Sequence, residues 1–170
     1  TVPKKSDVDV ITAELPLQTL KLTALRLETS ADQGNYVITS VQAQIIPPAN
    51  LPAPQARFVR VELPGKNQML QLAEVQVFSG ANNIAFQGEA SQSSEEYGGK
   101  AERAIDGNTD GVFDNNSVSH THGKTENPAW KLKFPRDVTL NTIIVWNRTD
   151  DKWKDRLKDF TVSVRDDKDK

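Results

Sequence analysis

Oxygen-bearing side chains alternate along the loop Asp106-Gly107-Asn108-Thr109-Asp110-Gly111. That pattern suits a hard cation such as calcium, which takes about six to eight oxygen ligands in proteins. The spacing also matches the first half of an EF-hand loop, but Ser117 stands where the closing Glu would lie. Because Asp, Asn and Gly also form ordinary surface turns, the loop alone leaves a metal site and an Asx-rich turn both open.

A second group of side chains could bind a sugar, because Arg and His donate hydrogen bonds to its oxygens and an aromatic face covers its C–H groups. Loops at one end of a sheet commonly carry such sites. The group consists, in chain order, of His120, His122, Arg148, Asp150, Trp153 and Arg156. A surface ion pair between Arg148 and Asp150, with Trp153 in the core, is the alternative interpretation.

The same residues give little support to catalysis. Ser119 and His120 are adjacent, and adjacent side chains on a strand point to opposite faces. No pair among the 23 Asp and Glu residues stands out on an aromatic-lined cleft, as glycoside hydrolysis requires. The sequence therefore predicts a binding protein and not an enzyme.

Composition narrows the class of protein further. The chain has 170 residues, of which 36% are hydrophobic and 26% charged, with a net charge of −2. The basic residues are scattered, which argues against nucleic-acid binding. No apolar run approaches the roughly eighteen residues that span a bilayer, and the absence of cysteine excludes disulfides and thiolate metal sites. The chain starts without Met or a signal peptide, so we expect a fragment of a longer protein with flanking domains.

The elements that must position these residues are strands. Apolar residues recur with a period of two, as in Phe58–Leu63, and turn residues such as Pro64-Gly65 separate the runs. One short helical piece is predicted at Lys100–Ile105. The predicted strands are Val8–Ile11, Leu20–Leu27, Tyr36–Ile46, Phe58–Leu63, Leu70–Phe78, Trp130–Phe134, Val138–Trp146 and Phe160–Val164. This pattern is typical of an all-β, antiparallel sandwich or barrel.

A proline-rich stretch divides the chain. Residues 47–56 contain the sequence PPANLPAP at Pro47–Pro54, which predicts a stiff linker. Residues 1–46 hold too few strands for an independent sandwich. We expect them to be either the tail of an upstream domain or accessory strands packed on the main module, which would occupy residues 57–170.

The order of motifs in residues 82–165 resembles the F-type lectin (fucolectin) family. The motifs that carry this resemblance are Asn83-Ile84-Ala85, Gly88–Ser94, Ala104–Asn108, Ser117–Thr121, Asn127–Trp130, Asn147–Asp150 and Arg156-Leu157. That family belongs with the discoidin, or coagulation factor 5/8 C-type, modules. The resemblance implies their galactose-binding-like jelly-roll β-sandwich.

The resemblance also implies roles for single residues. In the family a His and two Arg residues hold fucose, and these map to His120, Arg148 and Arg156, with Asp150 at the family's Asp position. Trp153 stands where the family often has a vicinal cysteine pair against the sugar.

The family binds a structural calcium ion. By resemblance its ligands map to the carbonyls of Arg103 and Ala73 and to Asp106, Asn108, Ser117 and Glu74. The strands that close the family's domain, similar to Arg57–Val61 and Leu72–Val77, stand here at the front of the domain. Their position predicts a circular permutation, because sandwich termini often lie close together. The alternative is that they close an upstream copy of the domain.

The resemblance therefore implies a secreted or cell-surface module with structural Ca²⁺, whose partners are fucose- or galactose-type glycans. The alternatives are a discoidin-type module that binds protein or lipid, and a structural spacer domain in a larger secreted protein. Leu22–Glu28 and Asn35–Thr39 are loosely similar to segments upstream of this module in large secreted bacterial proteins.

Overall fold

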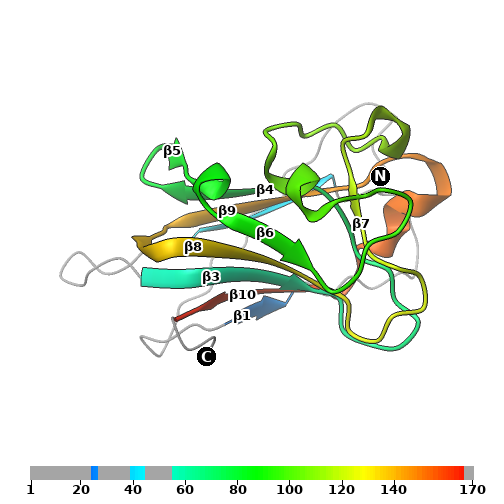
Figure 1. The fold of residues 1–170 in the computed structure, drawn as a ribbon, viewed down its shortest axis with the longest axis horizontal. Coiled ribbons are helices and arrows are strands. Elements are labelled where there is room, and N and C mark those ends of the chain that lie inside the picture. The colour runs from blue at the N-terminus through cyan, green and yellow to red at the C-terminus, as the bar shows by residue number, and fades with distance from the viewer. Residues whose placement is uncertain (1–23, 27–38, 45–54, 167–170) are drawn as a thin grey trace, which may run out of the picture.

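Two antiparallel β-sheets face one another in the computed structural model, which describes residues 24–26, 39–44 and 55–166 (Figure 1). The strands of the first sheet are, in spatial order, β1 (Ala24–Arg26), β10 (Thr161–Arg165), β3 (Gln55–Glu62), β8 (Ala129–Thr139) and β6 (Glu89–Gln92). Those of the second are β2 (Ser40–Gln44), β9 (Thr142–Asn147), β4 (Gln71–Ser79) and β5 (Asn82–Asn83), with β7 (Ser119–His120) also paired to β4. The predicted all-β antiparallel sandwich is confirmed.

In the described part of the chain, four short 3₁₀ helices lie in the connections between strands. They are η1 (Ala85–Gln87), η2 (Ala101–Ile105), η3 (Phe113–Asn115) and η4 (Asp151–Arg156). The predicted helical piece at Lys100–Ile105 corresponds to η2. No helix among the described residues is long and apolar enough to cross a membrane.

The core lies between the sheets and follows from the period-two alternation of the strands. Val59 and Val61 of β3 and Leu132 of β8 are fully buried there. Trp130 is also fully buried, and its indole N–H donates to the Ala101 carbonyl at 3.0 Å. This bond fixes η2, and with it the start of the Asp106–Gly111 loop, to the core.

Strand β4 changes phase in its middle. Leu72 pairs with Asn147 and Glu74 with Trp146, so Ala73 is the extra residue of a β-bulge. Leu72 before the bulge and Val75 after it therefore both face the core. Glu74 lies on the outer face of β4, where the loops of one end of the sandwich cover it.

The described parts of residues 1–46 add strands at the sheet edges. β1 pairs with β10, and β2 pairs with β9 (Figure 1). β3 begins at Gln55, inside the predicted linker. The stretch Pro47–Pro54 and the predicted strand Val8–Ile11 lie outside the described residues, so the division into domains stays a prediction.

One predicted strand is divided in the structure. The single run Val138–Trp146 is split by a turn at residues 140–141, between the end of β8 and the start of β9. Asn141 fixes this turn, because its N–H donates to the Phe78 carbonyl and its side-chain oxygen accepts from the Gly80 N–H, both at 3.0 Å. Apolar periodicity alone could not reveal the turn, since Leu140 is itself buried.

Candidate functional site

Three hydrogen-bond donors from different elements meet over the first residue of β4. His120 lies in β7, Arg148 follows β9, and Arg156 ends η4. His120 Nε2, Arg148 Nη1 and Arg156 Nη1 lie 2.7, 2.9 and 3.1 Å from one end of the Gln71 amide. Because arginine nitrogens are always donors, that end of the amide must be its oxygen. The structure thus brings together the three donors that the sequence singled out.

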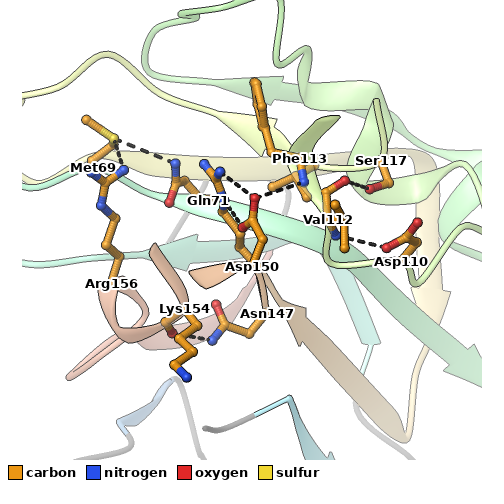
Figure 2. Close-up of polar contacts among 12 residues, drawn as sticks. Met69, Gln71, Asp110, Val112, Phe113, Ser117, Asn147, Asp150, Lys154 and Arg156 are labelled. Atoms are coloured by element: carbon orange, nitrogen blue, oxygen red, sulfur yellow. Dashed lines mark hydrogen bonds and ion pairs between the residues drawn. The ribbon is translucent and has the colours of Figure 1, made fainter. Parts of the chain in front are cut away.

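Asp150 holds Arg148 in place. Its carboxylate accepts from Arg148 Nε and, at 2.7 Å, from Nη2, which makes a bidentate pair. The hydrogen bond from Arg148 keeps the pKa of Asp150 below its ordinary value, so the carboxylate is ionised at neutral pH. Asp150 also accepts from the Phe113 N–H at 3.4 Å (Figure 2).

Aromatic rings surround the donors. The rings of Tyr97 and Phe113 meet the His120 ring edge-on, with centroids 5.2 and 5.4 Å apart. Tyr97 is 71% exposed and has a φ of 53°, which is uncommon for a bulky side chain. Phe113 also lies beneath the Arg148 guanidinium, 4.8 Å from it.

Trp153 lies beside Arg156 and not in the core. The Arg156 guanidinium sits 3.8 Å from the Trp153 ring centroid, a cation–π contact. The expected contact of this ring with a sugar therefore competes with Arg156 for one of its two faces. Tyr97 is the most exposed of the three aromatic residues at the site.

His120 is buried, with 3% of its surface exposed. Its Nδ1 lies 2.7 Å from the Thr121 carbonyl, so both ring nitrogens face oxygen acceptors. Burial lowers the pKa of His120, the hydrogen bond with the Thr121 carbonyl opposes this, and the charges of Arg148 and Arg156 lower the pKa as well. The imidazole is thus neutral at pH 7 and carries one N–H, and it is the Nε2–H tautomer that donates to Gln71.

The loop that follows η2 is built from successive Asx turns. The side-chain oxygens of Asp106, Asn108 and Asp110 accept from the backbone N–H two residues ahead, at 2.9, 3.0 and 2.9 Å. The loop ends at Ser117, which is fully buried and whose hydroxyl donates to the Val112 carbonyl at 2.8 Å (Figure 2).

Glu74 reaches this loop from the outer face of β4. Its Oε1 accepts from the Gly107 N–H at 3.2 Å, while its Oε2 is buried without a hydrogen-bond partner. Burial raises the pKa of Glu74 to about 7, and the nearby Asp106 carboxylate also raises it. An orphaned buried carboxylate oxygen beside a second carboxylate fits a site for a cation.

The remaining predicted ligands lie around the same loop. Ala73 is the bulged residue of β4, so the regular ladder to β9 does not use it. Arg103 lies in η2, and its side chain donates to the Asn116 side-chain oxygen at 2.9 Å, near the end of the same loop. No cluster of three His, Cys, Asp or Glu side chains in the described part of the chain could hold a metal. A cation here would depend on backbone carbonyl, amide and hydroxyl oxygens besides Glu74 and Asp106.

The loop and the donor site are in direct contact. The Thr149 N–H donates to the Gly111 carbonyl at 2.9 Å, and a Cβ on Gly111 would lie 2.5 Å from Thr149 Oγ1. Phe113, on η3 of the same loop, contacts Arg148 and His120. Figure 2 shows Asp110, Val112 and Ser117 beside Phe113 and Asp150. Whatever orders the loop therefore also orders the walls around the donors.

A groove of about 700 Å³ adjoins the donor site. Tyr97 and Arg156 belong to both the groove and the site. Both charge types line it, among them Glu96, Lys124 and Asp155. The donor site is thus bordered by this groove at Tyr97 and Arg156.

Three residues of the site were not predicted from the sequence: Gln71, Tyr97 and Phe113. Gln71 is the polar residue in the apolar alternation Leu70-Gln71-Leu72, which predicts a side chain that faces water. Nothing local indicated that loops from elsewhere in the chain would bury it. His122, by contrast, is exposed and pairs with Glu96 at 3.8 Å, outside the group of converging donors.

Part of the chain is similar to known proteins. Residues 103–170 match the family model of a NedA-like, galactose-binding domain of the F5/F8 type C kind. Fucolectin-2 of Anguilla japonica is 38% identical over 73 residues, which are 40% of this chain and 39% of the relative. Fucolectin of Anguilla anguilla is 34% identical over 73 residues, 40% of this chain and 46% of the relative.

The chain spans less than half the length of these curated relatives. No solved structure matches it significantly. The likeness to a galactose-binding domain and to fucolectins supports a carbohydrate-binding role.

Proposed function

We propose that this protein is a non-catalytic carbohydrate-binding module for fucose- or galactose-type glycans, with a structural calcium ion. The observation that carries the proposal is the convergence of His120, Arg148 and Arg156 on one side of the sandwich. Sugar hydroxyl and ring oxygens are acceptors, and fixed N–H donors with aromatic walls are the chemistry that recognises them.

Arg148 can donate hydrogen bonds to a ligand while it keeps those to Asp150 and Gln71. A guanidinium has five N–H donors, and the hydrogen bonds of Arg148 to Asp150 and Gln71 engage its three nitrogens once each. One further N–H on each terminal nitrogen is then free of these bonds. Asp150 keeps the guanidinium plane fixed, so a ligand would not have to order it.

The apolar side of the sugar would lie against an aromatic ring. Trp153 and Tyr97 are the candidates, and the high exposure of Tyr97 favours it. A non-enzymatic role is supported by Ser119, whose hydroxyl donates to the Leu72 carbonyl at 3.2 Å and not to a histidine.

Calcium would be held by Glu74, Asp106, Asn108 and Ser117 with the carbonyls of Ala73 and Arg103. The ion would supply positive charge to the buried Glu74 carboxylate and fix the loop against β4. The partnerless Glu74 Oε2 supports this assignment. The metal would be structural, because the donor residues lie over Gln71 and not over Glu74.

We also propose that the domain is circularly permuted. β3 lies between β10 and β8, and β4 lies next to β9. Strands from residues 55–79 thus complete the same sandwich as residues 103–165, whereas the family match begins only at residue 103. A collinear match to an unpermuted domain would leave these strands out.

The module would act outside the cell, secreted or at the cell surface, beside other domains of a longer chain. One monosaccharide offers few atoms, so a single site would bind weakly. Linking several modules raises avidity without new contacts. Flanking domains or repeated copies would therefore set the useful affinity.

A discoidin-type module that binds protein or lipid is the second candidate, because Tyr97 and Phe86 are 71% and 67% exposed. The two rings lie apart: η1, which carries Phe86, follows β5 at one end of β4, while Tyr97 contacts His120 of β7 at the other. They do not form one apolar patch, which favours the sugar site.

A glycan array in calcium tests the function. We expect binding to fucose- or galactose-terminated glycans, and its loss in His120→Ala and Arg148→Ala. The matched control is Arg136→Ala, which changes an exposed arginine outside both the converging group and the adjoining groove. The absence of any wild-type glycan signal would overturn the proposal, and sedimentation with phosphatidylserine liposomes would then test the second candidate.

A further inference from the structure

Gln71 is a buried amide at the centre of the donor site. Only 2% of its surface is exposed. Burial of a polar group without partners is unfavourable, and the Gln71 oxygen lies within 3.1 Å of three donors. Neither the sequence motif nor the proposed ligand contacts include this residue.

The three donors come from separate segments of the chain, so a shared contact is needed to fix their positions relative to one another. Arg148 and Arg156 are both cations, and they repel one another across the site. Burial and, after it, the charge of Arg148 lower the pKa of Arg156. A single acceptor oxygen between the two guanidinium groups offsets this repulsion and sets the distance between them.

Strand β4 gives that oxygen a fixed position. Gln71 pairs with His120 across the β4–β7 ladder, and its neighbour Leu72 pairs with Asn147, next to Arg148. Met69, two residues before it, receives the other contact of Arg156 Nη1 (Figure 2). The backbone and side chain of one strand thus reach all three donor segments.

Resting on the carbohydrate-binding function proposed above, we propose that Gln71 is the positioning residue of the site. Its amide oxygen is the shared acceptor that holds His120, Arg148 and Arg156 in the arrangement a sugar would meet. Gln71 acts from beneath the donors and does not itself bind the ligand.

Two substitutions separate this role from simple packing. Gln71→Met removes the acceptor at nearly constant volume, whereas Gln71→Glu keeps oxygen acceptors in place. Gln76→Met is the matched control, because Gln76 lies on the same strand and its oxygen accepts from the Trp146 indole at 3.2 Å, away from the site. Affinity for fucose and galactose is measured by calorimetry in calcium, and thermal melts verify folding.

We expect Gln71→Met to weaken binding about tenfold or more, the equivalent of one hydrogen bond to charged groups. Gln71→Glu should stay within about threefold of wild type, and Gln76→Met within about twofold, since both leave the donors an oxygen acceptor. Equal binding by wild type and a folded Gln71→Met would overturn the role of Gln71 while leaving the carbohydrate function intact.

An NMR titration of the His120 ring tests the contact between His120 and the Gln71 side chain without any ligand. A carboxylate favours the charged imidazolium, so Gln71→Glu should raise the pKa of His120 and Gln71→Met should not. If Gln71→Met fails to fold, Gln71→Glu still decides: an unchanged His120 pKa overturns the proposal. Failure of the wild type to bind any glycan overturns the proposed function itself, and with it a positioning role in sugar binding.

Discussion

Gln71 and Glu74 point outward from the same strand on the two sides of the Ala73 bulge, and each lies beneath a different loop. Gln71 meets the donors His120, Arg148 and Arg156, and Glu74 meets the backbone of the Asp106–Gly111 loop. Without the bulge, strict alternation would turn Glu74 toward the core side of the sheet. One extra residue therefore lets β4 support both proposed sites.

Chelation of calcium should lower the thermal stability. A ligand that binds only the folded state stabilises it by about 2.7 kcal/mol at a hundredfold excess over Kd, roughly 5–10 °C in Tm for a chain of this size. Differential scanning calorimetry with calcium and with EDTA measures the shift. Asp106→Ala and Glu74→Gln should remove the sensitivity to EDTA.

Asp114→Ala is the control for that experiment, because Asp114 is an exposed carboxylate in the same loop region outside the proposed ligand set. It should keep the full EDTA effect. Equal melting curves for the wild type in calcium and EDTA would remove calcium from the proposal.

Acid should destabilise the domain through His120. Burial holds its folded-state pKa below the ordinary value of 6.5, so below that pH the unfolded chain binds more protons than the folded one. Stability is then lost as the pH falls from about 6.5 toward the folded pKa. His120→Asn removes this dependence, and urea unfolding of both proteins between pH 5 and 8 in calcium measures it. If the difference in the free energy of unfolding between the wild type and His120→Asn does not change with pH over this range, the expectation is wrong.

Alternation predicted the sandwich because a half-buried strand needs apolar residues at every second position. The alternation also contains a sign of the bulge, which is recognised once the structure is known. The buried residues Leu70 and Leu72 are even-numbered, whereas the buried residues Val75 and Val77 are odd-numbered. The phase changes at Ala73. The turn at Asn141 left no such sign, because Leu140 continues the apolar run into the hairpin.

The donors were found by residue type, since Arg and His donate hydrogen bonds to sugar oxygens, and by their resemblance to a family motif. Gln71 was not found, because a polar residue in an alternating strand is expected to face water. It is buried here by segments around His120 and Arg156, which lie 49 and 85 positions further along the chain. Such coverage depends on tertiary packing and leaves no trace in the local pattern.

Removal of the Asp150 carboxylate should affect both stability and binding. Arg148 is 8% exposed at its side chain, so Asp150→Asn leaves a buried cation with weaker partners. We expect a loss of about 2 kcal/mol in the free energy of unfolding and weaker glycan binding, because Arg148 is no longer held. Denaturant unfolding and calorimetry with fucose measure the two effects.

Asp137→Asn is the matched control, since Asp137 is 53% exposed and lies 3.9 Å from Arg57. Exposed pairs of this kind contribute about 0–1 kcal/mol. A loss of stability in Asp150→Asn no larger than that of the control would show that Asp150 does not anchor Arg148.

Tyr97 should contribute to binding at the expense of stability. Its ring is exposed beside His120, and its φ of 53° is strained for a bulky residue. Asn tolerates this conformation, so Tyr97→Asn should leave the free energy of unfolding unchanged or raise it by about 1 kcal/mol. Loss of the ring should weaken fucose binding about fivefold, the worth of one aromatic contact. Asn67→Tyr puts a ring at another non-glycine position of positive φ, 56°, and gives the cost of strain alone. A Tyr97→Asn variant that is less stable but binds fucose as tightly as wild type would assign this ring to packing.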